Sequence, residues 1–212
     1  MEIKTTFYDI VGYLVPGIVL LAVLFVGYNN SMQCQQPFLE LKDLILNMSY
    51  KEAIVLGVLS YLIGHFISSI SYPVIEWLLL KIPCFKRFYR SEKIVGSNMY
   101  KAFSEKFKKT FGYEPQAGDF ATCICYVESK QPAVYSTTLI FKSFYGMARN
   151  LTLILWCYSL WELINWKMLK NHQSIGYFVV SLVVSFIIFY HYLRFLRYFK
   201  QNVLNGFILP LN

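Results

Sequence analysis

Two ionisable side chains stand inside long apolar stretches, where they are the residues best placed to do chemistry. His65 lies in the middle of one stretch and Glu162 lies in another. An ionisable group inside a bilayer is costly, so such residues are candidates for proton transfer, ligand binding or interhelical pairing. For His65 the alternative is a neutral ring bonded to a serine or a carbonyl of a neighbouring helix. Glu162 is four residues from Trp166, so we expect it at the outer interface, in contact with water.

The remaining reactive residues do not form a recognisable site. Cys123 and Cys125 are spaced like metal ligands, but no second pair of cysteines or histidines lies nearby at ligand spacing. The sequence also lacks the phosphate loop, the nucleophile elbow of hydrolases, the zinc-protease motif and the dinucleotide-binding fingerprint. We therefore expect a protein that is not an enzyme and that holds no metal or cofactor.

Four apolar segments must position these side chains. Each is about as long as the ~20 residues that a helix needs to cross a bilayer. They are Ile10–Tyr28, Ala53–Tyr72, Ala148–Trp166 and Ile175–Leu196. The chain is 56% hydrophobic and 15% charged, whereas soluble domains carry roughly 25% charged residues. The sequence predicts an all-α membrane protein with four transmembrane helices and a small helical cytoplasmic lobe between the second and third.

Basic residues predict the orientation of these segments. Twelve of the 20 Lys and Arg residues lie from Lys81 to Arg149. Under the positive-inside rule this part of the chain is cytoplasmic, and four spans then place both termini in the cytoplasm of a multi-pass protein of the inner (plasma) membrane. The chain divides into a first helix pair (1–80), a cytoplasmic basic helical region (81–147), and a second helix pair with a cytoplasmic tail (148–212). Because topology accounts for much of the net charge of +8, nucleic acid is not an expected partner.

Small residues recur along one face of the second segment. They follow one another at intervals of three, four, four and three residues, which defines one stripe of a helix, and they are Gly57, Ser60, Gly64, Ser68 and Ser71. Small side chains let helix backbones approach closely in lipid. We expect close helix packing here, either within one chain or between copies in a homo-oligomer. Chance enrichment of Gly and Ser in a membrane span is the alternative.

Two prolines predict bends in the apolar segments. Pro16 stands next to Gly17 in the first segment, where loss of a backbone donor and an adjacent glycine favour a kink. Pro73 follows the second segment, and we expect it to turn 74–82 into a separate stretch that lies along the inner membrane surface.

The region between the second and third segments is predicted to be helical. One helix has an aromatic face with basic residues on its other faces, and it ends before Gly112; the basic residues are Lys101, Lys106, Lys108 and Lys109. This pattern suits a helix that lies on anionic lipid headgroups, and packing of the aromatic face inside a bundle is the alternative. A short helix over Ala121–Val127, with a strand as the alternative, precedes a long helix from Pro132 to Trp166.

Two short stretches carry a family resemblance. One runs from Phe7 to Gly17, with an aromatic-Asp start followed by Val-Pro-Gly, and the other runs from Phe144 to Asn150 at the entry to the third segment. Both resemble small multi-pass bacterial membrane proteins of antiviral-defence neighbourhoods, such as the membrane accessory protein of type VI-B CRISPR systems, which modulates an RNA-targeting nuclease. The resemblance implies a regulatory role in defence and supplies no active-site residues.

Three functions of different classes fit these observations. The first is a regulatory or effector membrane protein that acts through oligomerisation and its cytoplasmic lobe, on a cytoplasmic protein partner or on membrane permeability. The second is a channel or transporter subunit, which requires a polar path across the bilayer. The third is a structural membrane scaffold without an activity of its own.

Overall fold

The computed structural model describes residues 7–32, 36–82, 97–116 and 119–209, and these residues form helices and no strand. The all-α prediction is therefore confirmed for them, and the ambiguous stretch Ala121–Val127 lies in a helix. The elements are η1, a turn of π-helix (Ile10–Leu14), α2 (Val15–Ser31), α3 (Pro37–Leu46), α4 (Tyr50–Lys81), α7 (Ser97–Phe111), α8 (Phe120–Lys130), α9 (Pro132–Leu169) and α10 (His172–Ile208).

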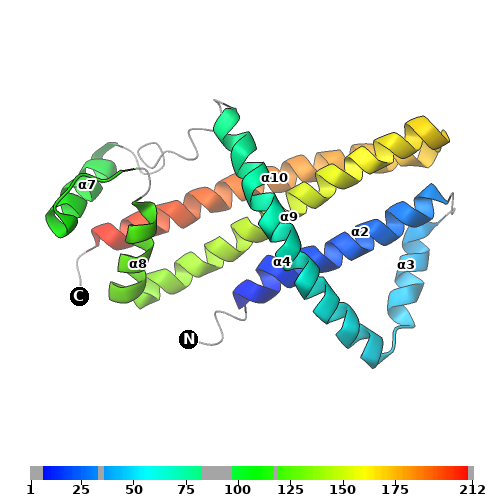
Figure 1. Ribbon diagram of the computed structural model, residues 1–212, viewed down its shortest axis with the longest axis horizontal. Coiled ribbons are helices and arrows are strands. Elements are labelled where there is room, and N and C mark those ends of the chain that lie inside the picture. The colour runs from blue at the N-terminus through cyan, green and yellow to red at the C-terminus, as the bar shows by residue number, and fades with distance from the viewer. Residues whose placement is uncertain (1–6, 33–35, 83–96, 117–118, 210–212) are drawn as a thin grey trace.

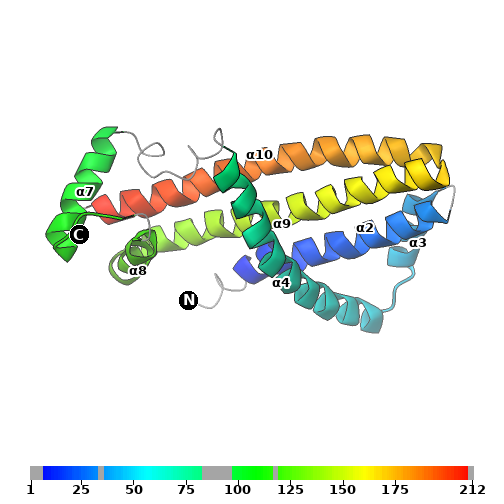
Figure 2. The same ribbon diagram turned by 45° about the horizontal axis from the view of Figure 1, so that its top comes forward.

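Two long helices, α9 and α10, form the frame of the molecule. They contain 38 and 37 residues, which corresponds to about 57 and 55 Å at 1.5 Å per residue. Figures 1 and 2 show them side by side as an antiparallel pair, with α2 alongside and α4 crossing the group obliquely. The long helix predicted to begin at Pro132 is confirmed, and it passes Gly146 without a break. Lys170, with φ of 52°, and Asn171 make the tight connection between the two helices.

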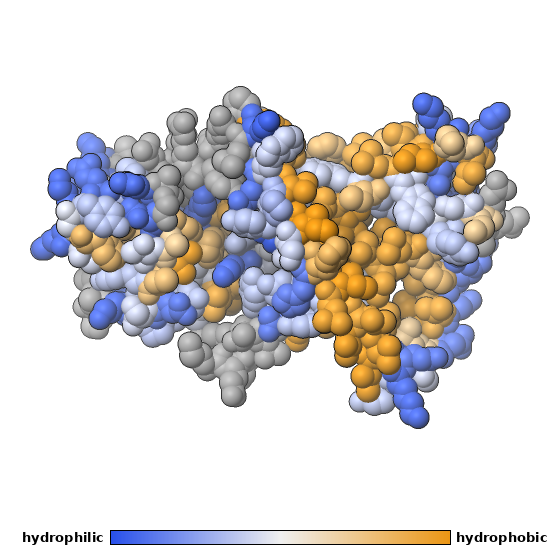
Figure 3. Space-filling model, viewed as in Figure 1, coloured by the Kyte–Doolittle hydropathy of each residue, from blue (hydrophilic) through white to orange (hydrophobic). Residues whose placement is uncertain are grey.

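Among the described residues, three helices are long and apolar enough to cross a membrane: Phe7–Ser31, Tyr50–Leu78 and His172–Ile208. The predicted third segment, Ala148–Trp166, lies in α9, which is not one of the three. Polar side chains such as Arg149, Asn150 and Glu162 make α9 less apolar, and all three are buried inside the protein. Figure 3 shows apolar surface over much of α4 and the adjoining bundle, with hydrophilic residues over α7, α8 and the opposite tip.

Helix α4 is longer than its predicted apolar segment. Ser49 and Glu52 form a capping box, in which the Ser49 N–H donates to Glu52 Oε2 at 2.7 Å and the Glu52 N–H donates to Ser49 Oγ at 3.4 Å. The expectation of a separate segment after Pro73 is wrong, because α4 continues through this proline to Lys81. A proline in a helix removes one N–H donor, and here the neighbouring turns hold the helix together.

The lobe, which we define as α7, α8 and the ends of α9 and α10 that pack on them, has its own aromatic core. Of the two alternatives for the aromatic face of α7, the structure shows bundle packing, because that face is covered by α10 and does not lie open for lipid. The core also crosses the predicted boundary at residue 147, since half of it comes from α10. Its buried members are Phe103, Phe107, Cys123, Val127, Phe199, Val203, Leu204 and Phe207.

One local prediction about the lobe, the end of α7 at Gly112, is confirmed. Gly112 ends α7 with φ of 84°, a left-handed conformation that favours glycine, and its N–H donates to the Lys108 carbonyl at 2.8 Å. At the other end of the lobe, Lys106 Nζ donates to the carbonyls of Ile208 and Leu209 at 3.2 and 2.8 Å. A cation at the last carbonyls of a helix is favourable, so Lys106 fastens α7 to the end of α10.

Candidate functional site

The small-residue stripe of α4 lies where this helix crosses η1 and α2. A Cβ atom on Gly64 would stand 1.9 Å from the Tyr13 carbonyl oxygen, and one on Gly17 would stand 1.7 Å from the Ser60 carbonyl oxygen. Backbone therefore touches backbone at both points, and neither glycine can be replaced without moving a helix. The same construction on Gly57 meets no atom within 4 Å. The stripe packs within the chain at this crossing, and its use between copies stays a prediction.

The far end of the stripe meets a buried arginine from α9. The Arg149 side chain is 6% exposed. Its Nε donates to Ser71 Oγ at 3.1 Å and its Nη2 donates to Ser68 Oγ at 3.0 Å. The guanidinium also lies over the ring of Tyr72, 5.2 Å from the ring centre, an arrangement that attracts a cation to the face of the ring.

Asn150, the next residue of α9, connects the same serine to the first helix. Ser71 Oγ donates to Asn150 Oδ1, and Asn150 Nδ2 donates to the Gly12 carbonyl at 3.1 Å. In a regular α-helix that carbonyl would accept from residue 16, but Pro16 has no N–H to donate. Where a bend at Pro16 was predicted, the chain forms a π-helical turn, and the Gly12 carbonyl in this turn accepts a hydrogen bond from Asn150 of α9. We call these groups the inner polar cluster, since they lie on the lobe side of the apolar segments: Gly12, Ser68, Ser71, Arg149 and Asn150.

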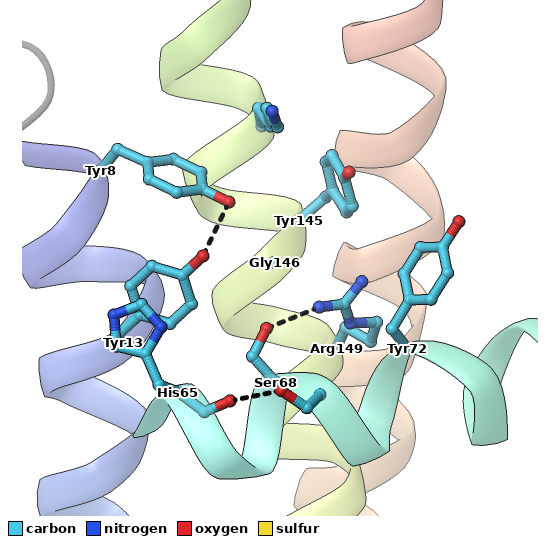
Figure 4. A pocket seen from close by; sticks show the side chains of 10 residues that line it. Tyr8, Tyr13, His65, Ser68, Tyr72, Tyr145, Gly146 and Arg149 are labelled. Atoms are coloured by element: carbon cyan, nitrogen blue, oxygen red, sulfur yellow. Dashed lines mark hydrogen bonds between the residues drawn. The ribbon is translucent and has the colours of Figure 1, made fainter. Parts of the chain in front are cut away.

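A cavity of about 380 Å³ opens beside the inner polar cluster. Figure 4 shows its side chains converging from the first helix, α4 and α9. The lining residues are Tyr8, Tyr13, His65, Ser68, Ser69, Tyr72, Lys142, Tyr145, Gly146 and Arg149. None of these described residues carries a carboxylate, while Lys142 and Arg149 are cations. The cavity therefore combines positive charge with a wall of hydroxyl groups and aromatic rings.

His65, the first candidate of the sequence analysis, belongs to this cavity. Its ring stacks on Tyr13, with centres 3.7 Å apart and planes 18° from parallel, and it meets Tyr61 edge-on. Tyr13 in turn has its hydroxyl 3.4 Å from the hydroxyl of Tyr8. The His65 side chain is exposed in the monomer, so the described contacts orient the ring by stacking and do not enclose it.

Glu162, the second candidate, lies in a different cluster at the other end of the bundle. We expected it to be wet, but its side chain is fully buried. Its Oε2 accepts from Asn30 Nδ2 at 2.6 Å, and Asn30 Nδ2 also donates to Ser174 Oγ at 2.9 Å. Oε1 of Glu162 and the hydroxyl of Tyr158 are buried without a hydrogen-bond partner in the described parts of the chain. The ends of α2 and α10 therefore shield the Glu162 side chain from water.

Further amides complete this second group, which we call the outer polar cluster. Asn171 Nδ2 donates to the Asn30 carbonyl at 2.8 Å, and the side chains of Trp161 and Asn165 donate to Ser31 Oγ at 3.2 and 2.8 Å. These bonds join the carboxyl end of α2 to the connection between α9 and α10. The cluster comprises Asn30, Ser31, Trp161, Glu162, Asn165, Asn171 and Ser174.

The other predicted residues lie apart from both clusters. Lys101, Lys108 and Lys109 are exposed on α7, and Lys108 forms an ion pair with Glu114 at 3.2 Å. Burial raises the pKa of the Cys123 thiol to about 12, which leaves it protonated and a poor metal ligand. Groups of three or more potential metal ligands do not occur among the described residues.

Sequence reasoning did not identify Arg149, Asn150 and Lys142 as site residues. Arg149 was counted as part of the basic flank that sets topology, which hid its role as a buried partner of α4. A signal was present in Pro16, because a proline in a membrane helix leaves a carbonyl that needs a donor from elsewhere.

Comparison of the chain with protein-family models, curated proteins and solved structures finds no match.

Proposed function

We propose that the protein is an integral membrane regulatory protein that crosses the inner membrane four times and acts through its cytoplasmic lobe on a partner. The observation that carries this proposal is the continuity of α9 and α10. Each helix runs without interruption from the outer polar cluster, past the cavity, into the lobe core. A change of packing at the cavity therefore has a direct mechanical route to the lobe.

Packing supports α9 as an additional span, the third in chain order, beside the three apolar helices. It pairs with α10, which is long and apolar enough to cross a membrane, and it also contacts α2 and α4. Its end is bonded to the end of α2 through Glu162 and Asn30. A helix held between spanning helices shares their path, and Arg149, Asn150 and Glu162 of α9 each hydrogen-bond to those neighbours.

The lobe is fastened to both long helices, as a transmitting device requires. Phe199 of α10 contacts Tyr145 of α9 with ring centres 5.3 Å apart, one turn before Arg149. Farther along, Phe207 contacts Phe103 and Phe107 of α7 at 5.5 and 5.8 Å. Both sets of contacts belong to the lobe core, in which Val203 and Leu204 also lie, so packing extends from the level of the cavity to α7.

The polar groups of the bundle favour regulation over transport. Asn150 and Glu162 are twelve residues apart on α9, or about 18 Å. Between them, Ser159 is bonded to the Leu155 carbonyl and to Ser181. The two clusters are therefore separate, whereas a channel needs a continuous polar path. Purified protein in liposomes should pass neither ions nor a small dye, and flux through the wild-type protein would replace this proposal with the channel function.

Topology is tested by labelling single cysteines in sealed cells. Asn47 and Glu114 are exposed residues on opposite sides of the proposed membrane. In a background without native cysteines, Asn47→Cys should react with an impermeant maleimide and Glu114→Cys should react only after lysis. Reaction of both, or the reverse pattern, would contradict four spans with a cytoplasmic lobe. The native cysteines Cys34 and Cys84 lie outside the described residues.

The partner and the defence context belong to the same proposal. A photocrosslinking residue at Lys101 or Lys109 of the lobe should give a defined adduct in cells, while one at Lys51, on the other side, should not. An adduct with the mass of two copies would indicate the homo-oligomer.

The defence context implied by the resemblance predicts that genes of an antiviral system flank this one, and a purely metabolic operon would contradict it.

A further inference from the structure

The cavity beside Arg149 contains positive charge that no described residue pairs with. Arg149 is buried, and its two recorded donor contacts end on serine hydroxyls. Neither Arg149 nor Lys142 forms an ion pair with any described residue. Glu76 interacts with Tyr72 one turn farther along α4 but does not line the cavity. A buried cation without a counter-charge is strongly unfavourable, so an anion in the cavity would relieve a cost already present in the fold.

The donors that remain suit a tetrahedral oxyanion. Nη1 of Arg149 has no hydrogen bond to a described residue, and guanidinium groups bind phosphoryl oxygens with several parallel donors. Lys142 Nζ lies 5.6 Å from the centre of the Tyr8 ring, on the same cavity wall. The Ser69 hydroxyl donates to the His65 carbonyl at 3.0 Å and the Tyr13 hydroxyl is 3.4 Å from that of Tyr8, so each would serve an anion by rotating away from its present partner.

The cavity also lies where lipid headgroups would be. Tyr72 ends the second predicted span, Arg149 is the second residue of the third, and Tyr8 stands just before the first. Tyrosines and cations at the cytoplasmic ends of spans occupy the headgroup level of the bilayer. With about 380 Å³, the cavity falls in the size range of small-molecule sites and has room for more than one phosphoryl group alone.

Exposed apolar residues next to the cavity favour a lipid over a soluble anion. On α4, Phe66 and Ile70 are 68% and 42% exposed, and they flank Ser68 and Ser69 of the cavity wall. In a membrane these side chains face acyl chains. A phospholipid whose headgroup enters between α4 and α9 would place its chains along this surface.

We propose that the cavity between η1, α4 and α9 binds the phosphoryl headgroup of an anionic phospholipid of the inner leaflet, with Arg149 and Lys142 as its cationic ligands. This inference rests on the membrane placement of the proposed function. It adds the ligand that would sit at the start of the route to the lobe. Lipid binding would then change the packing of α4 against α9. Because α9 is continuous, it would transmit this change to the lobe.

Native mass spectrometry of the full chain, extracted in detergent, tests the proposal. The protein is titrated with phosphatidylglycerol or with phosphatidylcholine of identical chains. We expect a single phosphatidylglycerol to bind roughly tenfold more tightly than phosphatidylcholine, because both lipids carry one phosphodiester but the choline cation would be repelled by Arg149 and Lys142. Lys142→Gln should remove most of this preference. Lys101→Gln removes the same charge from an exposed position on α7 and should keep it.

Three outcomes would overturn the proposal. Equal affinity for the two lipids excludes an anionic headgroup site, and equal loss of preference in Lys142→Gln and Lys101→Gln assigns the preference to net charge. Thermal stabilisation by inorganic phosphate, at concentrations where phosphatidylglycerol gives none, assigns the cavity to a soluble phosphate. Arg149→Gln is a second test, since it should lose the preference even more completely, and circular dichroism shows whether that variant remains helical.

This experiment separates the two proposals. If the wild-type protein is extracted from membranes and folded but shows no lipid preference, the headgroup site is excluded and the proposed function still stands. If the protein is absent from the membrane fraction, the proposed topology is excluded, and the headgroup site with it.

Discussion

The inner and outer polar clusters solve the same problem, how to hold polar side chains among apolar helices, in opposite ways. At the outer cluster, Glu162 is fully buried, accepts from the amide of Asn30 in α2, and is enclosed together with Asn171 from the connection between α9 and α10. At the inner cluster, Arg149 is held by two serines beside a cavity of about 380 Å³. The closed cluster acts as a fastening between helices. The open one has donors left over, which is what a binding site needs.

The two clusters also join different sets of helices. The outer cluster ties α2 to both α9 and α10, because Asn30 bonds Glu162 of α9 and Ser174 of α10. The inner cluster depends on α4, the obliquely crossing helix, which reaches α9 through Ser68 and Ser71. A shift of α4 would change the cavity without disturbing the outer end. Four substitutions test this contrast, from the largest expected effect to the smallest.

The largest effect is expected at the crossing that supports the inner cluster. Gly64→Leu would drive a side chain into the Tyr13 backbone, so we expect a loss of roughly 3 kcal/mol or more in unfolding free energy. Gly57→Leu places the same side chain where a Cβ meets nothing within 4 Å and should cost little. Thermal unfolding in detergent compares the two. Equal stability would show that the crossing does not support the inner cluster.

The outer cluster should respond to loss of its carboxylate. Glu162→Ala removes the acceptor for Asn30 and leaves a void, so we expect a loss of about 2 kcal/mol. Glu162→Gln keeps the shape and an acceptor oxygen, and should stay within about 1 kcal/mol of the wild-type protein. Chemical denaturation in detergent provides the measurement. If the glutamine variant were as unstable as the alanine variant, the outer cluster would depend on charge, and the contrast with the inner one would fail.

At the inner cluster, Arg149→Lys separates charge from geometry. Lysine keeps the positive charge but cannot reach Ser71 and Ser68 with a planar fork, so we expect about 1 kcal/mol of destabilisation. The same unfolding assay measures it, with Lys109→Arg on the exposed face of α7 as the control exchange. A variant as stable as the wild-type protein would mean that charge alone holds α4 to α9.

The smallest effect on stability is expected for Lys142→Gln. Lys142 is half-buried and its described contact is with the Tyr8 ring, so the unfolding free energy should change by no more than about 0.5 kcal/mol. The same variant is expected to lose lipid preference, which makes it the clearest divider between structure and binding. A loss above about 1 kcal/mol would place Lys142 among the structural groups, as at the outer cluster.

Helices and their ends were largely predictable from the sequence, whereas the residues of other helices that pack against each face were not. Pro132 and Gly112 mark helix ends because they act locally on the backbone. The aromatic face of α7 was predicted as a face, but its partner Phe207 lies in another helix, and periodicity carries no information about that. Glu162 depends on Asn30, 132 positions away in the chain, and its burial follows from the fold alone.

Arg149 shows a further limit. A basic residue at the cytoplasmic end of a span satisfies the positive-inside rule whether it faces water or protein. One pattern therefore had two physical causes, and only the position of α4 separates them. The predicted third span illustrates the same point, because the polar residues that make α9 less apolar are those that bind it to its neighbours.

The outer polar cluster has a consequence for the synthesis of the protein. Asn30 leaves the ribosome well before its partners Glu162 and Ser174, which are 132 and 144 positions later in the chain. Synthesis at roughly 5–20 residues per second leaves Asn30 waiting for several seconds or longer. During that time its amide faces lipid or a chaperone. A chain that stops before the hairpin of α9 and α10 keeps this amide unpaired, and so carries a built-in mark by which membrane quality control can recognise it as unfinished.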